Sequence, residues 1–175
     1  IGQGFIQTTP IQLCLMTAQI ANGGYKIYPK IVANDDNQYA DKFTPLYKKS
    51  RNIKIIQDAM FSSTNEVRGT SYRSRLDDPK YRFAGKTGTS QVKKITERDR
   101  ELDLKTFQIP YEERDHALYV AFGPYKSPRY ALSIIIEHGG SGGTVAAPLA
   151  KELFKMIVDR HEIRKNYDNK KYLDI

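Results

Sequence analysis

The chain has 175 residues, of which 39% are hydrophobic and 27% charged, as expected for a soluble globular domain. No apolar run approaches the roughly 18 residues of a membrane-spanning helix, and no N-terminal signal pattern is present. The single cysteine, Cys14, excludes an internal disulfide and a cysteine-based zinc site, and the three histidines are scattered. We therefore predict neither a metal site nor a cofactor.

The net charge of +8 favours anionic partners in principle. The basic residues are spread along the chain, however, and no nucleic-acid-binding motif accompanies them. We therefore expect a solvated basic surface and no nucleic-acid partner, and a basic nucleic-acid binder stays only as a weaker alternative.

The first predicted element is a helix that begins at Pro10. Thr9 is a favourable N-cap and forms a Thr-x-x-Gln capping box with Gln12, and Asn22-Gly23-Gly24 supplies a stop. Helical spacing puts these residues on its apolar face: Ile11, Cys14, Leu15, Ala18 and Ala21 or Asn22. Cys14 is accordingly interpreted as a small core residue.

Residues 25–32 resemble a short strand pair or an extended edge, broken by Pro29. The polar stretch 33–50 predicts a loop. Residues 52–63 return to helical spacing through Ile53, Ile56, Ala59 and Met60.

The second half of the chain predicts three neighbouring strands. A polar connection (68–79) leads to a strand at 81–92, and the long charged segment 93–115 predicts a functional or mobile loop. The apolar runs 116–125 and 129–140 predict a hairpin of buried strands.

A last helix follows the glycine run 139–143, which is interpreted as a flexible turn more readily than as an anion nest. Its apolar stripe consists of Leu149, Ala150, Leu153, Phe154 and Ile157. Residues 1–160 are assigned to one domain and 161–175 to a polar C-terminal tail. The predicted fold is α+β, with an antiparallel sheet covered by helices.

The stretch "FAGKTGTSQV" (83–92) places a lysine beside small hydroxyl residues, a combination that holds anions. A nucleotide-binding P-loop would need a glycine where Lys80 stands and a helix after the motif, whereas "SQVKK" continues as a strand. In a serine acyl-transfer site, the lysine provides positive potential and the hydroxyls bind a substrate carboxylate. The glycine lets the substrate approach, and a backbone N–H supports the oxyanion.

The motif and its surroundings resemble class B penicillin-binding proteins, specifically the C-terminal part of the transpeptidase domain of the elongation-type penicillin-binding protein 2. "AGKTGTSQV" is similar to the third motif of that family, and "IGQGFIQTTPIQLCLMTAQIANGG" to its Ile-Gly-Gln-Gly helix. "RDHALYVAFGPYKSPRYALSIIIEHGGSGGTVAAPLAKEL" resembles the final strand pair and helix.

The resemblance implies a peptidoglycan D,D-transpeptidase that forms an acyl-enzyme on a serine. In that reading Lys86 is catalytic, Thr87, Gly88 and Thr89 bind substrate, and Gly85 serves close packing. Implied partners are peptidoglycan stem peptides, β-lactam antibiotics, and the glycan polymerase and scaffold proteins of the elongation machinery. The implied setting is the periplasmic face of the bacterial inner membrane, reached through an upstream anchor, with this stretch itself soluble.

The family also uses Ser-x-x-Lys, which carries the nucleophile, and Ser-x-Asn, both expected upstream of residue 1. Two short matches inside the chain are interpreted as surface and capping residues instead: Ser90-x-x-Lys93 follows the motif strand, and Ser63-Thr64-Asn65 ends a helix. The non-enzymatic alternative is an inactive scaffold or interaction module that keeps the fold. The intact upstream motifs would distinguish the enzyme from it.

Outside the motif, His116 resembles a family histidine and is interpreted as a structural hydrogen-bonding residue. His138 stands where the family more often has Asn, so no catalytic role is assigned to it. The loop 93–115 has two open interpretations: a gate or acceptor-strand contact, and simple solvation of its charges.

The 175-residue chain alone is expected neither to react with penicillin nor to cross-link peptides, because the serine nucleophile is expected elsewhere. Labelling of the purified chain with a fluorescent penicillin checks this expectation. A label on any serine of residues 1–175 would contradict it.

Overall fold

The computed structural model describes residues 6–31, 44–46, 50–93 and 104–171, with side chains described through Lys165. The main elements in chain order are α1 (Pro10–Ala21), α2 (Ser50–Asn65), β1 (Ala84–Ser90), β2 (His116–Gly123), β3 (Tyr130–Ile136) and α4 (Ala147–Lys171). Short 3₁₀ turns lie at Tyr72–Ser74, Thr106–Gln108 and Tyr111–Glu113, and a π-helical turn at Gly142–Ala146 leads into α4.

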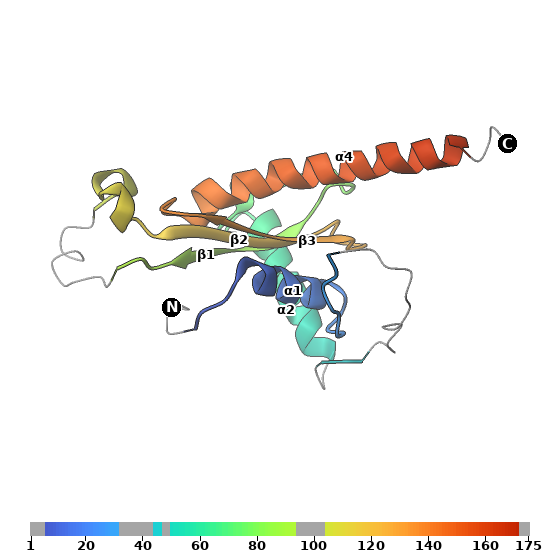
Figure 1. The fold of residues 1–175 in the computed structure, drawn as a ribbon, viewed down its shortest axis with the longest axis horizontal. Coiled ribbons are helices and arrows are strands. Elements are labelled where there is room, and N and C mark those ends of the chain that lie inside the picture. Colours follow the sequence, from blue (N-terminus) through green and yellow to red (C-terminus); the bar gives the residue numbers. More distant parts are fainter. Residues whose placement is uncertain (1–5, 32–43, 47–49, 94–103, 172–175) are drawn as a thin grey trace.

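The three strands form one antiparallel sheet in the order β1-β2-β3. The register places Thr87 opposite Tyr119 and Tyr119 opposite Ile134. Helix α4 crosses one face of this sheet, while α1 and α2 lie on the other side (Figure 1). The predicted α+β arrangement of a helix-covered antiparallel sheet is therefore confirmed.

Helix α1 begins and ends where local sequence predicted. The Gln12 N–H donates to the Thr9 hydroxyl at 3.3 Å, and the Thr9 N–H donates back to the Gln12 side-chain oxygen at 2.8 Å. At the other end, Asn22 caps the helix and its side-chain oxygen accepts from the Gly24 N–H. Gly23 and Gly24 then adopt φ values of 91° and 90°, which suit glycine.

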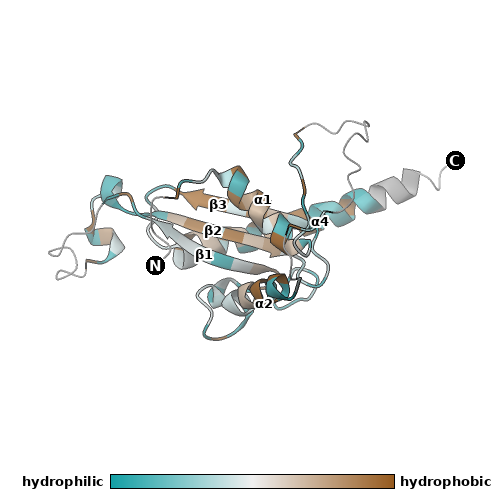
Figure 2. Ribbon diagram, turned by 90° about the horizontal axis from the view of Figure 1, so that it is seen from below, coloured by the Kyte–Doolittle hydropathy of each residue, from teal (hydrophilic) through white to brown (hydrophobic). Residues whose placement is uncertain are grey.

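Two hydrophobic clusters lie on opposite faces of the sheet, and strands β2 and β3 carry more hydrophobic residues than β1 (Figure 2). Beneath α4, Phe83 stacks on Phe154 with ring centroids 4.9 Å apart, and Tyr119 meets Phe83 edge to face. On the α1 and α2 side, Met60 packs with Ala84 and Phe122. Burial of these large side chains is the main contribution to the stability of the layered fold.

The predicted apolar stripes are only partly buried. Ala150 and Phe154 of α4 are fully buried, but Leu149 and Leu153 are 44% and 41% exposed. Ile56 of α2 is likewise 41% exposed, although Ile53 and Met60 of the same stripe are buried. Spacing alone cannot tell how wide a stripe the sheet covers.

Four other expectations can be compared with the described residues. Residues 25–31 do not form a strand pair, because one isolated bridge from Tyr25 to Pro45 is all that pairs there within the described residues. The tail expected from residue 161 continues α4 as far as Lys171. Most of the predicted loop 33–50 lies outside the described residues. Cys14 is half-buried, its thiol lies 3.4 Å from the Ala131 carbonyl, and burial raises the pKa of that thiol.

The hydroxyl of Tyr119 ties the sheet to α2. The ring is buried under β1, and its oxygen lies 3.0 Å from the Thr64 hydroxyl and 2.9 Å from the Ser71 hydroxyl. Burial raises the pKa of Tyr119, and the bonds to Ser71 and Thr64 oppose that shift. Gly85 is required beside it, because a Cβ there would fall inside contact distance of the Tyr119 hydroxyl.

Replacing Tyr119 with Phe is expected to lower the free energy of unfolding by about 1–3 kcal/mol, because the buried Thr64 and Ser71 hydroxyls lose a partner. Chemical denaturation of the Tyr119→Phe variant measures the loss. The matched control is Tyr111→Phe, on a side chain that is 56% exposed, and it is expected to stay within about 0.5 kcal/mol of the parent. Equal stability of both variants would contradict the role given to the Tyr119 hydroxyl.

Candidate substrate-binding strand

Strand β1 forms one edge of the described sheet, and three carbonyls within residues 83–87 accept hydrogen bonds from side chains. The Asn65 side-chain amide donates to the first at 2.9 Å, the Thr64 hydroxyl reaches the second at 3.5 Å, and the Lys86 ammonium donates to the third at 2.8 Å. These carbonyls belong, in order, to Phe83, Gly85 and Thr87.

Alternate residues of a strand direct their backbone groups to opposite edges. The outward carbonyls of Gly85 and Thr87 therefore imply that Thr89 also turns its N–H and C=O to the outer edge. The side chain of Lys86 is exposed, Thr87 and Gly88 are half-buried, and Thr89 is exposed. The edge thus combines outward backbone groups, hydroxyls and a cation within four consecutive residues.

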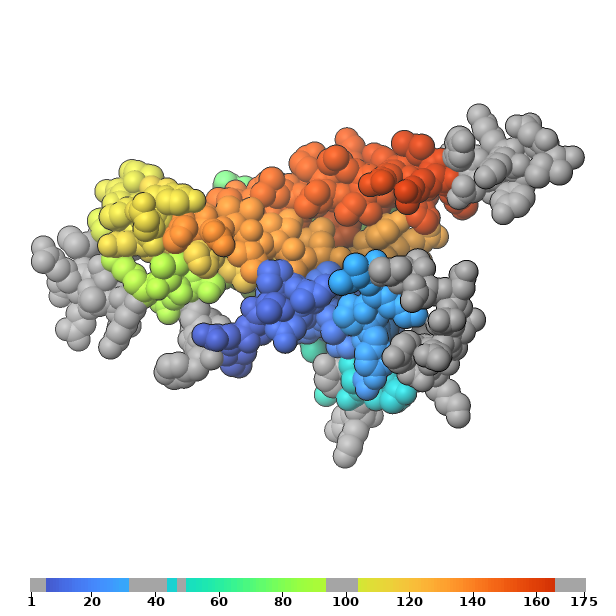
Figure 3. Space-filling model, viewed as in Figure 1, coloured from blue at the N-terminus to red at the C-terminus, as the bar shows by residue number. Residues whose placement is uncertain are grey.

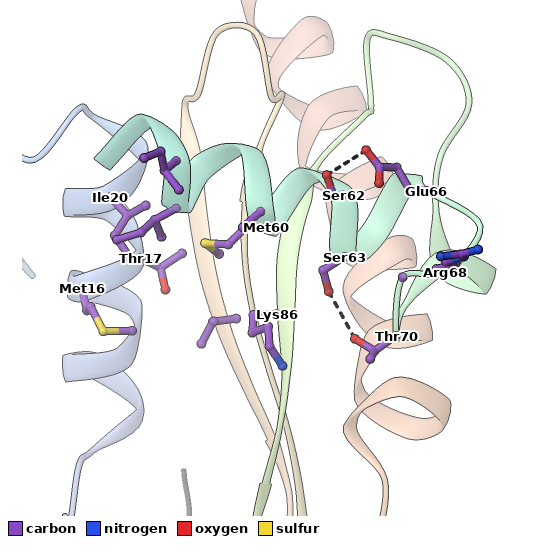
Figure 4. Close-up of a pocket in the computed structure, with 15 residues that line it drawn as sticks. Met16, Thr17, Ile20, Met60, Ser62, Ser63, Glu66, Arg68, Thr70 and Lys86 are labelled. Atoms are coloured by element: carbon purple, nitrogen blue, oxygen red, sulfur yellow. Dashed lines mark hydrogen bonds between the residues drawn. The ribbon is translucent and has the colours of Figure 1, made fainter. Parts of the chain in front are cut away.

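A row of hydroxyl groups continues from the cation across to α2. Lys86 Nζ lies 3.3 Å from the Thr87 hydroxyl, which lies 3.1 Å from the Thr70 hydroxyl. The Thr70 hydroxyl in turn lies 3.2 Å from that of Ser63 (Figure 4). An ammonium group and polarised hydroxyls in a row suit a carboxylate, because each donates a charge-assisted hydrogen bond to it.

A pocket of about 630 Å³ opens beside this row, between α1, α2 and β1. Figure 4 shows Met16, Thr17 and Ile20 of α1 facing Met60 of α2, with Lys86 entering from β1. The mouth near Thr70 carries charged and polar groups, whereas the α1–α2 end is apolar. The pocket therefore offers an apolar surface adjoining a cationic, hydroxyl-rich edge.

The start of the π-helical turn covers β1 from the α4 side. A Cβ on Gly142 would collide with the carbonyl oxygens of Leu118 and Gly88, and one on Gly143 would come within 2.7 Å of the Thr70 carbonyl oxygen. Glycine is needed at both positions because backbone approaches backbone directly. The glycine run therefore forms a turn into α4, as predicted, but the turn is tightly packed and not flexible as expected.

The structure places Lys86, Thr87, Gly88 and Thr89 on one strand, as the motif predicted. Of the two short matches, one begins at Ser90, the last residue of that strand, and the other begins at Ser63, which reaches the motif through the Thr70 hydroxyl. Ser90 ends β1, and Lys93 beyond it pairs with Glu113 at 2.5 Å. Asn65, at the end of α2, binds the carbonyls of Phe61 and Phe83. Residues 90–93 are not helical, so Lys93 does not lie one helical turn after Ser90 as the nucleophile motif requires.

Sequence reasoning did not predict Thr70 as a neighbour of the motif, and it interpreted Ser63 as a surface or capping residue. Both come from the α2 end and the connection that follows it, where no periodicity or glycine pattern distinguishes them. The contact between Thr70 and Thr87 joins residues 17 apart in the chain. Only the tertiary arrangement of α2 against β1 shows it.

His116 acts as the predicted structural residue, because its ring nitrogen Nδ1 accepts the His138 N–H at 2.9 Å. In the part of the chain that the structure describes, no cluster of three or more histidine, cysteine or acidic side chains is arranged to hold a metal ion. Likewise, none of the described helices is both long and apolar enough to cross a membrane.

Fold and edge strand together define a penicillin-recognising transpeptidase domain. The family model "Penicillin binding protein transpeptidase domain" matches residues 1–155, so the chain belongs to this family.

Within the family, the chain is similar to curated peptidoglycan D,D-transpeptidases named MrdA. It is 32% identical to the Salmonella typhimurium protein over 173 residues, covering 91% of this chain and 26% of that protein. The Acinetobacter baumannii protein is 34% identical over 88% of this chain and 23% of its own length. The chain thus spans about a quarter of the length of these relatives.

Solved structures of penicillin-binding protein 2 are also similar to the chain. Pseudomonas aeruginosa PBP2 in complex with WCK 5153 superposes with a TM-score of 0.69 at 33% identity, over 89% of this chain and 32% of that one. Helicobacter pylori PBP2, solved as a complex with MreC, gives a TM-score of 0.68 at 29% identity, over 93% of this chain and 26% of that one.

The packing around β1 predicts that an alanine costs different amounts of stability at Gly142, which packs on the strand, and at Gly88, which belongs to it. Gly142→Ala is expected to lower the free energy of unfolding by about 2 kcal/mol or more, because its methyl group meets backbone that cannot move aside. In Gly88→Ala the nearest atom is the Leu118 Cβ at 3.2 Å, so the cost is expected to stay within about 1 kcal/mol. Thermal or chemical denaturation checks both, and the reverse order would contradict the described packing.

Proposed function

We propose that the protein containing this chain is a peptidoglycan D,D-transpeptidase and that β1 is the substrate-binding wall of its active site. The observation that carries the proposal is the outward-facing edge of β1, with Lys86 and Thr87 joined by hydrogen bonds at its centre. Family membership and the names of the similar proteins support the same activity.

In this proposal Thr87 and Thr89 bind the terminal carboxylate of the substrate peptide through their hydroxyls. Lys86 supplies positive potential and takes part in proton transfer. Gly88 lets the substrate chain approach, because its lack of a side chain leaves the strand surface low. The outward N–H of Thr89 faces the side where an oxyanion would form.

An extended peptide fits this edge by adding a strand to the sheet, with main-chain hydrogen bonds giving affinity and side chains giving specificity. A carboxylate anchored at Thr87 then fixes the register of the peptide. The scissile bond lies close to that carboxylate in a D-Ala–D-Ala terminus, so the register also positions the reacting carbonyl.

The nucleophile is a serine that we place outside residues 1–175. Its oxygen forms a bond to the carbonyl of the D-Ala–D-Ala peptide, and the terminal D-Ala leaves with a proton. An amine of a second stem peptide then attacks the acyl carbon, the ester bond to the serine breaks, and the amine's proton returns to the serine oxygen. Neither Ser90 nor Ser63 is suited to this role, because Ser90 is at a strand end and Ser63 bonds Thr70 without a nearby lysine on its own helix.

The proposed ligands follow from this chemistry and from the family. They are stem peptides as substrate and β-lactams as acylating inhibitors. A scaffold protein of the elongation machinery is a further proposed partner, supported by the MreC complex of the Helicobacter pylori relative. A glycan polymerase, an upstream anchor and a position on the periplasmic face of the inner membrane complete the proposal.

In the complete protein, Thr87→Val is expected to slow acylation by a fluorescent penicillin about 10- to 100-fold, because a hydrogen bond to a charged carboxylate is lost. Stopped-flow or gel-based acylation kinetics measure the second-order rate constant.

Ser90→Ala is the matched control on the same strand, and its rate is expected to stay within about twofold of the parent, since a solvated surface hydroxyl contributes little. A folded Thr87→Val protein that acylates at the parent rate would overturn the assignment. A large loss of acylation rate in Ser90→Ala would instead make Ser90 a candidate nucleophile.

A further inference from the structure

The end of the sheet next to the substrate-binding strand carries a pair of histidine rings that no part of the proposed mechanism uses. His116 is the first residue of β2 and lies opposite Ser90, just beyond the Lys-Thr-Gly-Thr motif. Its ring centroid lies 4.9 Å from that of His138, in the turn after β3. Both rings are half-buried.

The bond between the two histidines requires one protonation state. His116 Nδ1 accepts the backbone N–H of His138 at 2.9 Å, so this nitrogen must be without a proton. The His138 Nδ1 lies 3.2 Å from the Arg114 carbonyl oxygen, so that nitrogen must donate. A proton added to His116 Nδ1 would face the His138 N–H directly, and the bond would be replaced by repulsion.

Several charged and titratable groups lie on the elements that surround the two rings. The Arg114 guanidinium binds the Ile109 carbonyl and lies over the Tyr111 ring, which in turn contacts the His138 ring. Other charged or titratable groups of the neighbouring elements are Asp115, whose carboxylate accepts the Val92 N–H, Glu113, which pairs with Lys93, and Glu137.

The bond holds a strained turn that runs on to the site. His138 has a φ of 55°, a left-handed conformation that costs free energy for a residue with a side chain. The Gly140 N–H donates to the Asp115 carbonyl at 2.8 Å, and Gly142 then packs on Gly88 of the motif. Figure 3 shows the 104–115 segment in yellow and the end of β1 in green gathered with the strand pair at this end of the molecule.

We propose that His116 and His138 form a pH-sensitive latch that holds residues 138–143 against β1. With its Nδ1 unprotonated, His116 accepts the His138 N–H and keeps the turn closed over Thr87 and Gly88. Protonation of that nitrogen removes the acceptor, so the latch opens and the cover over the strand loosens. The effect on substrate binding rests on the proposed function, whereas the opening of the turn does not.

Amide hydrogen exchange on the complete protein at pH 7.5 and 5.5, corrected for intrinsic exchange rates, tests the latch. Protection of amides 138–142 is expected to fall about 3- to 10-fold at the lower pH, the equivalent of one hydrogen bond. Amides in the middle of α2 serve as the internal reference and are expected not to change. Equal protection of the turn at both pH values would overturn the proposal.

Two variants sharpen the test. His116→Gln offers a non-titrating acceptor, so its turn is expected to exchange alike at both pH values. His138→Asn tolerates the left-handed backbone and keeps the N–H donor, so it is expected to retain the pH effect, which acts through His116. A pH effect that persists undiminished in His116→Gln would overturn the latch.

Histidine NMR needs no variant and keeps the proposal testable if His116→Gln fails to fold. At pH 7.5 the His116 ring is expected to carry its proton on Nε2. A proton on Nδ1 would contradict the bond to His138. Because none of these readouts measures acylation, a failed latch and a failed transpeptidase assignment remain distinguishable.

Discussion

The position of β1 depends on the buried hydroxyl of Tyr119. This one oxygen contacts Thr64 at the end of α2 and Ser71 in the connection that follows, from a ring that β2 places directly beneath Gly85. An unpaired hydroxyl in such a core costs free energy, so the three elements are held in one arrangement. The strand that carries the motif is therefore held in place by contacts on its buried side.

Because the Tyr119 contacts hold β1 on its buried side, its outer edge can present many polar groups. Thr64 and Asn65 at the end of α2 reach the carbonyls of Gly85 and Phe83, which aligns the outer edge. The following turn brings Thr70 to Thr87. A cation, a row of hydroxyls and outward backbone groups can then remain in place without burial of their own, which is what binding of a charged peptide terminus requires.

Local patterns predicted the parts of the fold that local physics determines. The capping box at Thr9 and the stop at Asn22 need only neighbouring residues, and the hairpin of β2 and β3 follows from two apolar runs joined by a turn. The role of the motif on β1 was predicted because its flanking segments resemble a known family. The exposure of Leu149 and Leu153 was not predicted, because spacing shows that a helix face is apolar but not what covers it.

The hydroxyl contacts around β1 could not be predicted from the sequence, because they depend on tertiary packing. Ser71 and Tyr119 are 48 residues apart, and the bond between them depends on how α2 packs against the sheet. Serine and threonine in a polar connection resemble solvated loop residues, so nothing in the pattern of residues 68–79 indicated that Ser71 is buried or that Thr70 adjoins the motif. The functional contacts lie where sequence periodicity is silent.

The central claim is that the edge of β1 binds the substrate carboxylate. The most direct measurement is a crystal structure of the complete protein after reaction with a penicillin. The account predicts that the carboxylate of the bound acyl group accepts hydrogen bonds from the Thr87 and Thr89 hydroxyls, with the acyl chain running along the outer edge of β1. A carboxylate held away from both threonines, with the edge of β1 unoccupied, would contradict it.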